Sequence, residues 1–307
     1  MANFIEIFVS IILPVFILIT LGVILQKKFS LDLYTLAKLN IYYFVPGIIF
    51  VKLYEAQFTM ETFLYVLLFC IVFVGFLQFI TFIIGRLFKF SKGMRVAFTN
   101  SVIFYNSANY GVPVNDLVFK SDPFAMSIQV VVLTFQNILT FSYGIFSLQS
   151  MDGGKLKALL SYFKMPLFYS MMFGVIFNVS NLPVPSFLWV PIKYISDGLI
   201  AVALLTLGAQ IAQLRFSFKQ LTIYLSLFIR LILGPVIAFC LVVLLNLDGI
   251  LAQALIISSA MPTSVNSAII AQEYKNEPEY AAQIVLVSTI FSAVTVTLVI
   301  FFTQLLF

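Results

Sequence analysis

Histidine is missing from this sequence of 307 residues, and cysteine occurs only twice. The absence of histidine removes the commonest metal ligand and the usual proton relay near neutral pH. It also excludes serine–histidine and cysteine–histidine catalysis. Cys70 and Cys240 lie deep inside apolar runs, where we expect them to pack as small hydrophobic groups. The sequence therefore predicts no metal, no cofactor and no enzymatic activity.

Charged residues are also scarce: they make up 9% of the chain, while 62% is hydrophobic. A typical soluble domain is about 25% charged, and no water-soluble fold can hide so much apolar surface. We therefore expect lipid to surround a single membrane domain. The net charge of +5 does not indicate nucleic acid, because the Lys and Arg residues stand in short clusters between apolar runs, where they orient helices in a bilayer.

The apolar runs predict about ten transmembrane helices, since a helix needs about 20 apolar residues to cross a bilayer. The predicted spans are 5–25, 33–53, 62–84, 97–119, 124–148, 165–178, 191–211, 221–245, 250–271 and 281–307. Most of the Lys and Arg residues then fall in loops on one side, which is typical of the cytoplasmic side. This asymmetry predicts a multi-pass protein of the cytoplasmic membrane with both termini outside the cytoplasm.

The longest link, around residues 149–164, divides the chain near its midpoint. Pro14 and Pro166 are each followed eight residues later by Gly-Val-Ile. If each half holds an odd number of spans, the two halves enter the membrane from opposite sides. The sequence thus predicts an all-α membrane protein of two inverted five-helix repeats, residues 1–150 and 151–307, a design that recurs in secondary transporters.

Two spans in corresponding positions, the fourth and the ninth, are interrupted by polar residues and helix breakers. The fourth contains Asn106, Asn109, Gly111 and Pro113; proline lacks an amide donor, and glycine adopts conformations closed to other residues. We expect the fourth helix to break there, and backbone freed in this way must face a protein interior or a cavity.

The ninth span carries Met261, Pro262, Thr263, Ser264 and Asn266. A matched pair of broken helices is the best sequence indication of a transport site. Each outgoing half-helix is predicted to begin just after its proline, and its amide groups and positive dipole end favour an anion. The Asn, Ser and Thr side chains can donate hydrogen bonds to a carboxylate. Packing alone is the competing interpretation, because proline kinks and small polar residues are common in such helices.

Arg230 lies near mid-depth of the eighth span, and an intramembrane charge marks a functional position by default. It is predicted to be a counter-charge for the substrate or a brace for the carbonyls of the broken helices. Snorkelling to the interface is the alternative. No carboxylate falls clearly at mid-membrane, which favours uniport, exchange or a proton carried on the substrate over a dedicated proton relay.

These local patterns resemble the auxin efflux carrier family of permeases, which includes bacterial malonate and malate transporters. The resemblance rests on Leu13-Pro14 with Leu21-Gly22, Val45-Pro46-Gly47, Asn109 to Pro113, Leu207-Gly208, Arg230 with Gly234-Pro235, and Met261-Pro262-Thr263. It implies crossed broken helices four and nine that flank the substrate, with Pro46 facing them. It further implies a scaffold part that forms a homodimer and a transport part that moves across it. The short central link makes auxin itself a doubtful substrate.

The leading hypothesis is a secondary carrier for small mono- or dicarboxylates such as malate or malonate. A sodium-coupled organic anion symporter on the same type of fold is the first alternative, because Ser, Thr and Asn groups near both breaks offer oxygen ligands. A channel or a non-transporting sensor is the second alternative. Channels commonly line a pore with repeated polar groups, whereas here the polarity is concentrated at two points.

Overall fold

A computed structural model describes residues 3–56, 59–149, 166–213 and 221–307. Within these ranges the chain is helical and contains no β-strand, and the regular backbone elements run from Phe4 to Leu306. Seven helical stretches are long and apolar enough to cross a membrane. The all-α membrane architecture is therefore confirmed. The central link at 150–165 lies outside the described residues.

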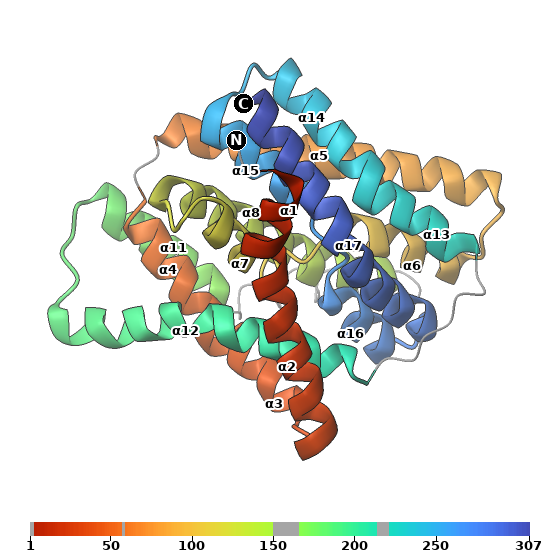
Figure 1. The fold of residues 1–307 in the computed structure, drawn as a ribbon, viewed down its shortest axis with the longest axis horizontal. Helices are drawn as coiled ribbons and strands as arrows, with labels where there is room; N and C mark the ends of the chain where they lie inside the picture. The colour runs from red at the N-terminus through yellow and green to blue at the C-terminus, as the bar shows by residue number, and fades with distance from the viewer. Residues whose placement is uncertain (1–2, 57–58, 150–165, 214–220) are drawn as a thin grey trace.

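The helices fall into two groups that contact each other. The first group contains α1 (Phe4–Ile7), α2 (Leu13–Phe29), α3 (Leu33–Leu39), α4 (Val45–Tyr54), α11 (Pro166–Val179) and α12 (Ser186–Ile211). Within it α2 packs along α12, and α4 packs against both α11 and α12. Figure 1 shows α12 crossing α2, with α4 and α11 on the same side of the molecule.

The second group holds the remaining helices, and it includes both interrupted spans. It comprises α5 (Met60–Leu87), α6 (Lys92–Ile103), α7 (Gly111–Val118), α8 (Pro123–Leu139), α9 (Ile145–Gln149), α13 (Leu221–Phe228), α14 (Gly234–Leu244), α15 (Gly249–Ser259), α16 (Val265–Glu273) and α17 (Pro278–Leu306). The N- and C-termini lie on the same side of the molecule (Figure 1), and α1 contacts α17.

Three long helices contain a π-helical turn just before a proline. These turns are Phe8–Ile12 before Pro14, Asn40–Phe44 before Pro46, and Ile229–Leu233 before Pro235; a further one, Thr140–Gly144, joins α8 to α9. Proline has no amide to donate and clashes with the preceding turn. A wider turn accommodates it without ending the helix. Two of these turns bring Asn40 and Arg230 into the interior of the protein.

Lipid-facing and protein-facing sides differ in the expected way. Large apolar side chains such as Phe187, Leu87 and Ile5 are more than two-thirds exposed, which lipid satisfies and water does not. The buried interior, by contrast, contains many Ser, Thr, Asn and Gln side chains around the two breaks. The fold therefore buries polar side chains and exposes apolar ones, as expected for a protein surrounded by lipid.

Candidate functional site

The two interrupted helices are broken where the sequence predicts, and the breaks touch each other. The helix α6 ends at Ile103 and α7 begins at Gly111, while α15 ends at Ser259 and α16 begins at Val265. The non-helical segments between them pair through an antiparallel bridge from Tyr105 to Thr263. We call this pair of segments, 104–110 and 260–264, the crossover.

Each segment of the crossover satisfies backbone groups of the other. The Asn106 amide donates to the Pro262 carbonyl at 2.8 Å, and the Ser264 amide donates to the Phe104 carbonyl at 2.9 Å. The Thr263 hydroxyl adds a hydrogen bond to the Ser101 carbonyl at 2.7 Å. Because buried backbone groups need hydrogen-bond partners, each break supplies partners that the other requires.

The predicted start of the outgoing half-helices was wrong in detail. They begin at Gly111 and Val265 rather than directly after Pro113 and Pro262. Pro113 lies within the first turn of α7, where a missing amide has no cost. Pro262 lies in the extended crossover, where its carbonyl accepts the bond from Asn106.

The amide ends of the outgoing half-helices are less open than predicted. The Gly111 amide donates to the Asn106 carbonyl at 2.9 Å, and the Val112 amide donates to the Ala108 carbonyl at 3.2 Å. Ser264 caps α16 by accepting from the Asn266 amide at 3.3 Å. The dipoles of α7 and α16 still point their positive ends toward the crossover, but side chains must supply most of the free donors.

Gly111 is needed for space and not for an unusual backbone conformation. A side chain here would place its Cβ 2.6 Å from Gln129 Nε2 and 3.3 Å from the Asn106 carbonyl oxygen, and its φ is not left-handed. Gln129, on α8, donates to the Ser107 carbonyl at 2.7 Å and accepts from the Ser258 hydroxyl. One glutamine thus joins the first break to the helix that leads into the second.

Arg230 is fully buried, which excludes snorkelling to the interface. Its guanidinium donates to the Val102 carbonyl at 2.8 Å and to the Ser259 carbonyl. These carbonyls belong to the last turns of α6 and α15, the two helices that run into the crossover. Helix C-termini carry about half a negative charge each, so one guanidinium neutralises both. Among the described residues Arg230 has no carboxylate partner, and it lies 4.8 Å from the centroid of the Tyr105 ring.

A narrow polar cleft lies between the crossover and the first group of helices. Its lining includes four of the predicted site residues, Asn106, Asn109, Ser264 and Asn266. The space open to the centre of a water molecule is only about 40 Å³, enough for about three waters. A substrate must widen it to enter.

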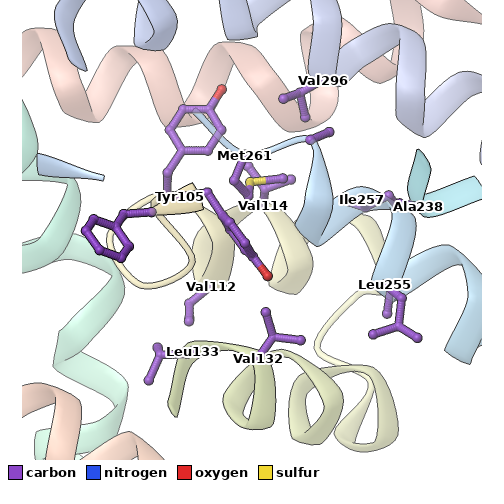
Figure 2. Packing of buried hydrophobic residues seen from close by; sticks show 14 of the residues in the cluster. Tyr105, Val112, Val114, Val132, Leu133, Ala238, Leu255, Ile257, Met261 and Val296 are labelled. Carbon is purple, nitrogen blue, oxygen red and sulfur yellow. The ribbon is translucent and has the colours of Figure 1, made fainter. Parts of the chain in front are cut away.

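The other predicted site residues do not line this cleft. Met261, Pro262, Thr263, Gly111 and Pro113 are buried in and next to the crossover, and Figure 2 shows Tyr105, Val114 and Met261 in this buried core. Pro46 is also buried, next to Val45, which lines the cleft. The structure therefore separates residues that shape the breaks from residues that face the cleft.

Comparison with known proteins finds similarity to membrane transporters. The family described as membrane transport protein matches residues 155–300. An uncharacterized transporter of Methanothermobacter thermautotrophicus is 23% identical over 94% of this chain and 95% of its own length. Another, from Methanocaldococcus jannaschii, is 24% identical over 38% of this chain and 37% of its own length. The chain is thus similar to membrane transport proteins over its second half and to one uncharacterized transporter over nearly its whole length. It is a multi-pass membrane transporter.

The transporter's cleft also contains polar residues that the sequence interpretation did not single out. They are Asn40, Gln136, Asn137, Thr140, Thr206 and Gln210. Each lies inside a long apolar run, and a polar side chain at membrane depth is costly unless it has a partner. A search for such isolated polar residues in every span, and not only for helix breakers, would have found them.

A wider cavity of about 830 Å³ adjoins the cleft. Ala37, Gln210 and Val265 line both the cleft and this cavity. Its other walls include Tyr34 in α3 and Glu279 at the start of α17. Lys27 and Lys28 lie in the last turn of α2, which precedes α3, and Lys275 lies just before α17. The cavity that adjoins the cleft is therefore walled by segments that directly follow basic residues in the chain.

Proposed function

We propose that this transporter is a secondary carrier of small organic anions, such as mono- or dicarboxylates of the size of malonate or malate. The observation that carries the proposal is the meeting of two broken helices at a polar cleft. Positive helix ends and uncharged amide donors together stabilise a carboxylate without a fixed counter-charge. Arg230 is occupied by the carbonyls of Val102 and Ser259, so in this proposal it braces the crossover.

We further propose that the chain forms about ten transmembrane helices in two inverted repeats, 1–150 and 151–307. The correspondence of α6 and α7 with α15 and α16 supports this symmetry. The two helix groups then correspond to a scaffold, which forms a homodimer, and a moving part, by elevator-like or rocking alternating access. With both termini outside the cytoplasm, the 830 Å³ cavity opens inward, and the described conformation is cytoplasm-facing.

Counterflow in reconstituted vesicles tests the carrier mechanism. Vesicles are loaded with unlabelled malonate or malate, and entry of the labelled acid is followed. A carrier shows trans-stimulation, whereas a channel does not. We expect Asn109→Ala and Asn266→Ala to reduce counterflow at least about tenfold, the cost of one lost hydrogen bond to a charged group, while leaving thermal unfolding unchanged. Undiminished counterflow in both variants would refute the proposed site.

Sodium coupling is a second candidate, because the cleft lining contains hydroxyl and amide oxygens such as Thr140, Thr206 and Asn40. Sodium prefers several oxygen ligands, but none of the described residues that line the cleft is Asp or Glu. We therefore expect uptake to persist when sodium is replaced by choline. Loss of uptake in choline would make the symporter the better assignment.

A further inference from the structure

Four buried polar atoms on the walls of the cleft have no hydrogen-bond partner among the described residues. They are the side-chain nitrogens of Asn106 and Gln136 and the side-chain oxygens of Asn40 and Gln210. Buried groups of this kind are rare in native proteins, because an unmade hydrogen bond costs the full desolvation of the group. A guest in the cleft would be within reach of both kinds of atom.

The two nitrogens are fixed as donors by the backbone. The side-chain oxygen of Asn106 accepts from the Asn109 amide at 3.1 Å. The side-chain oxygen of Gln136 accepts from the Tyr105 amide at 3.3 Å. A backbone amide can only donate, so neither side-chain amide can turn over without losing this bond. Each NH₂ group is therefore left for an acceptor in the cleft.

Asn40 is fixed in the opposite sense. The Thr206 hydroxyl donates to the Val202 carbonyl at 2.7 Å, and a carbonyl can only accept. The Thr206 oxygen must then accept from the Asn40 NH₂ group, 2.9 Å away. The side-chain oxygen of Asn40 is therefore left without a partner among the described residues. It can only accept a hydrogen bond, so its partner must be a donor. The first helix group thus contributes an acceptor to the cleft, while the second contributes the two donors.

We propose that the cleft selects anions that carry a hydrogen-bond donor as well as a carboxylate. The carboxylate would bind the NH₂ groups of Asn106 and Gln136, and the donor would bind the oxygen of Asn40. Two chemical sources supply such a donor: an alcohol O–H, as in a hydroxy acid, or the O–H of a singly protonated dicarboxylic acid. This inference rests on the proposed function, since it assigns the substrate class of the same cleft.

A guest that lacks the donor leaves the Asn40 oxygen buried and unpaired. Sites built to bind a substrate hydroxyl reject the analogue without it strongly, because the protein's own polar group then stays unsatisfied. Thr206 acts here as a positioning residue, since it determines which end of the Asn40 amide faces the cleft. Without its hydroxyl, the Asn40 side chain can rotate and offer a donor instead.

Thermal stabilisation of the purified protein by matched acids tests the proposal. The pairs are lactate with propanoate, hydroxymalonate with malonate, and malate with succinate. At neutral pH we expect the hydroxy member of each pair to bind at least about tenfold more tightly, a conservative value for such discrimination. Below the second ionisation of the diacids, malonate and succinate should gain affinity if a carboxyl O–H serves equally well, whereas propanoate should not.

Two variants of Thr206 complete the test. In Thr206→Val the preference for the hydroxy acid should fall to about twofold or less, because the hydroxyl that orients Asn40 is gone. In Thr206→Ser the preference should remain, since serine keeps the hydroxyl. Equal binding of both members of the pairs by the unmodified protein at neutral pH, or an unchanged preference in Thr206→Val, would overturn the proposal. Failure of every carboxylate to bind or to support counterflow would instead remove the proposed function, and this inference with it.

Discussion

Two of the helix crossings in this transporter are built in opposite ways. At the first, α2 and α12 cross as unbroken helices, and Gly22 and Gly208 allow their backbones to touch. A Cβ on Gly208 would lie 1.9 Å from the Ile19 carbonyl oxygen, and one on Gly22 would lie 2.2 Å from that of Leu205. At the second, the crossover, both helices are interrupted and exchange hydrogen bonds.

The difference shows that unbroken helices allow close packing, whereas broken helices supply polar groups that can bind a ligand. Unbroken helices keep every backbone group satisfied internally, so small residues can bring them together without any polar cost. Broken helices expose backbone groups and helix ends, which need partners such as Arg230 and Gln129. The unbroken α12 presents the side chains of Thr206 and Gln210 to the cleft, whereas the broken helices also point their positive ends toward it. The predictions below, in order of decreasing effect, test this contrast.

The largest effect is expected at Arg230, because the crossover depends on it. Arg230→Gln removes two charged hydrogen bonds to the carbonyls of Val102 and Ser259, each worth about 1.5–3 kcal/mol. We expect a loss of about 4 kcal/mol and a large fall in the unfolding temperature in detergent. Arg230→Lys keeps the charge and should lose about half as much. Equal stability of both variants with the unmodified protein would show that the crossover needs no brace.

A smaller loss is expected at the unbroken crossing. Gly208→Ala places a methyl group against the backbone of α2, which cannot move aside as a flexible side chain can. Overpacking typically costs about 1–3 kcal/mol, and a backbone contact favours the upper end. Gly75→Ala is the control, because a Cβ there meets nothing within 4 Å and alanine favours a helix by about 1 kcal/mol. Thermal unfolding that fails to separate the two variants would contradict the close approach of α2 and α12.

Most of the fold is predictable from the sequence because lipid imposes simple rules. The predicted spans 33–53 and 124–148 correspond closely to the helical stretches Leu33–Tyr54 and Pro123–Leu148. Hydrophobic length fixes where helices begin and end, and Pro113 and Pro262 locate the breaks. The start of α16 at Val265 was missed. Pro262 prevents a helical hydrogen bond, but it does not determine how many non-helical residues follow it.

The candidate site was less predictable. Asn106, Asn109, Ser264 and Asn266 were found because they stand next to helix breakers. Asn40, Gln136 and Thr206 were missed because their partners are far away in the sequence; the contact between Asn40 and Thr206 joins residues 166 positions apart. The role of Arg230 was left open for the same reason, since only the fold shows which carbonyls it meets.

Gln129 tests whether the two breaks support each other through α8. Gln129→Met keeps the length of the side chain but leaves the Ser107 carbonyl and the Ser258 hydroxyl without their partner. We expect a loss of about 2 kcal/mol, within the range for unsatisfied buried polar groups. Gln78→Met on α5 is a matched control, because among the described residues the Gln78 side chain bonds only to the partly buried Tyr143 hydroxyl. Unfolding temperatures of the two variants should differ, with Gln129→Met the lower; the reverse order would argue against the bridge.

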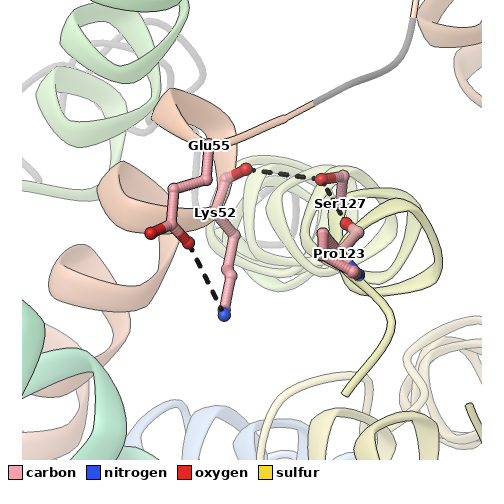
Figure 3. A network of polar contacts seen from close by, with 4 residues as sticks. All are labelled: Lys52, Glu55, Pro123 and Ser127. Atoms are coloured by element: carbon pink, nitrogen blue, oxygen red, sulfur yellow. Dashed lines mark hydrogen bonds and ion pairs between the residues drawn. The ribbon is translucent and has the colours of Figure 1, made fainter. Parts of the chain in front are cut away.

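The smallest effect is expected where α4 meets α8, away from both crossings (Figure 3). Lys52 and Glu55 form a partly exposed ion pair at 3.9 Å, and such pairs contribute about 0–1 kcal/mol. The Ser127 hydroxyl has one proton to donate, and it is 2.7 Å from the Pro123 carbonyl of its own helix but 3.4 Å from the Lys52 carbonyl. We therefore expect Lys52→Met and Ser127→Ala to change the free energy of unfolding by less than about 0.5 kcal/mol. A larger loss in Ser127→Ala would mean that its bond to the Lys52 carbonyl holds α8 and α4 together, whereas Lys52→Met reports only on an ion pair within α4. Under the proposed alternating access, weak polar contacts at this boundary favour relative motion of the two groups, because every strong contact between them would have to break in each transport cycle.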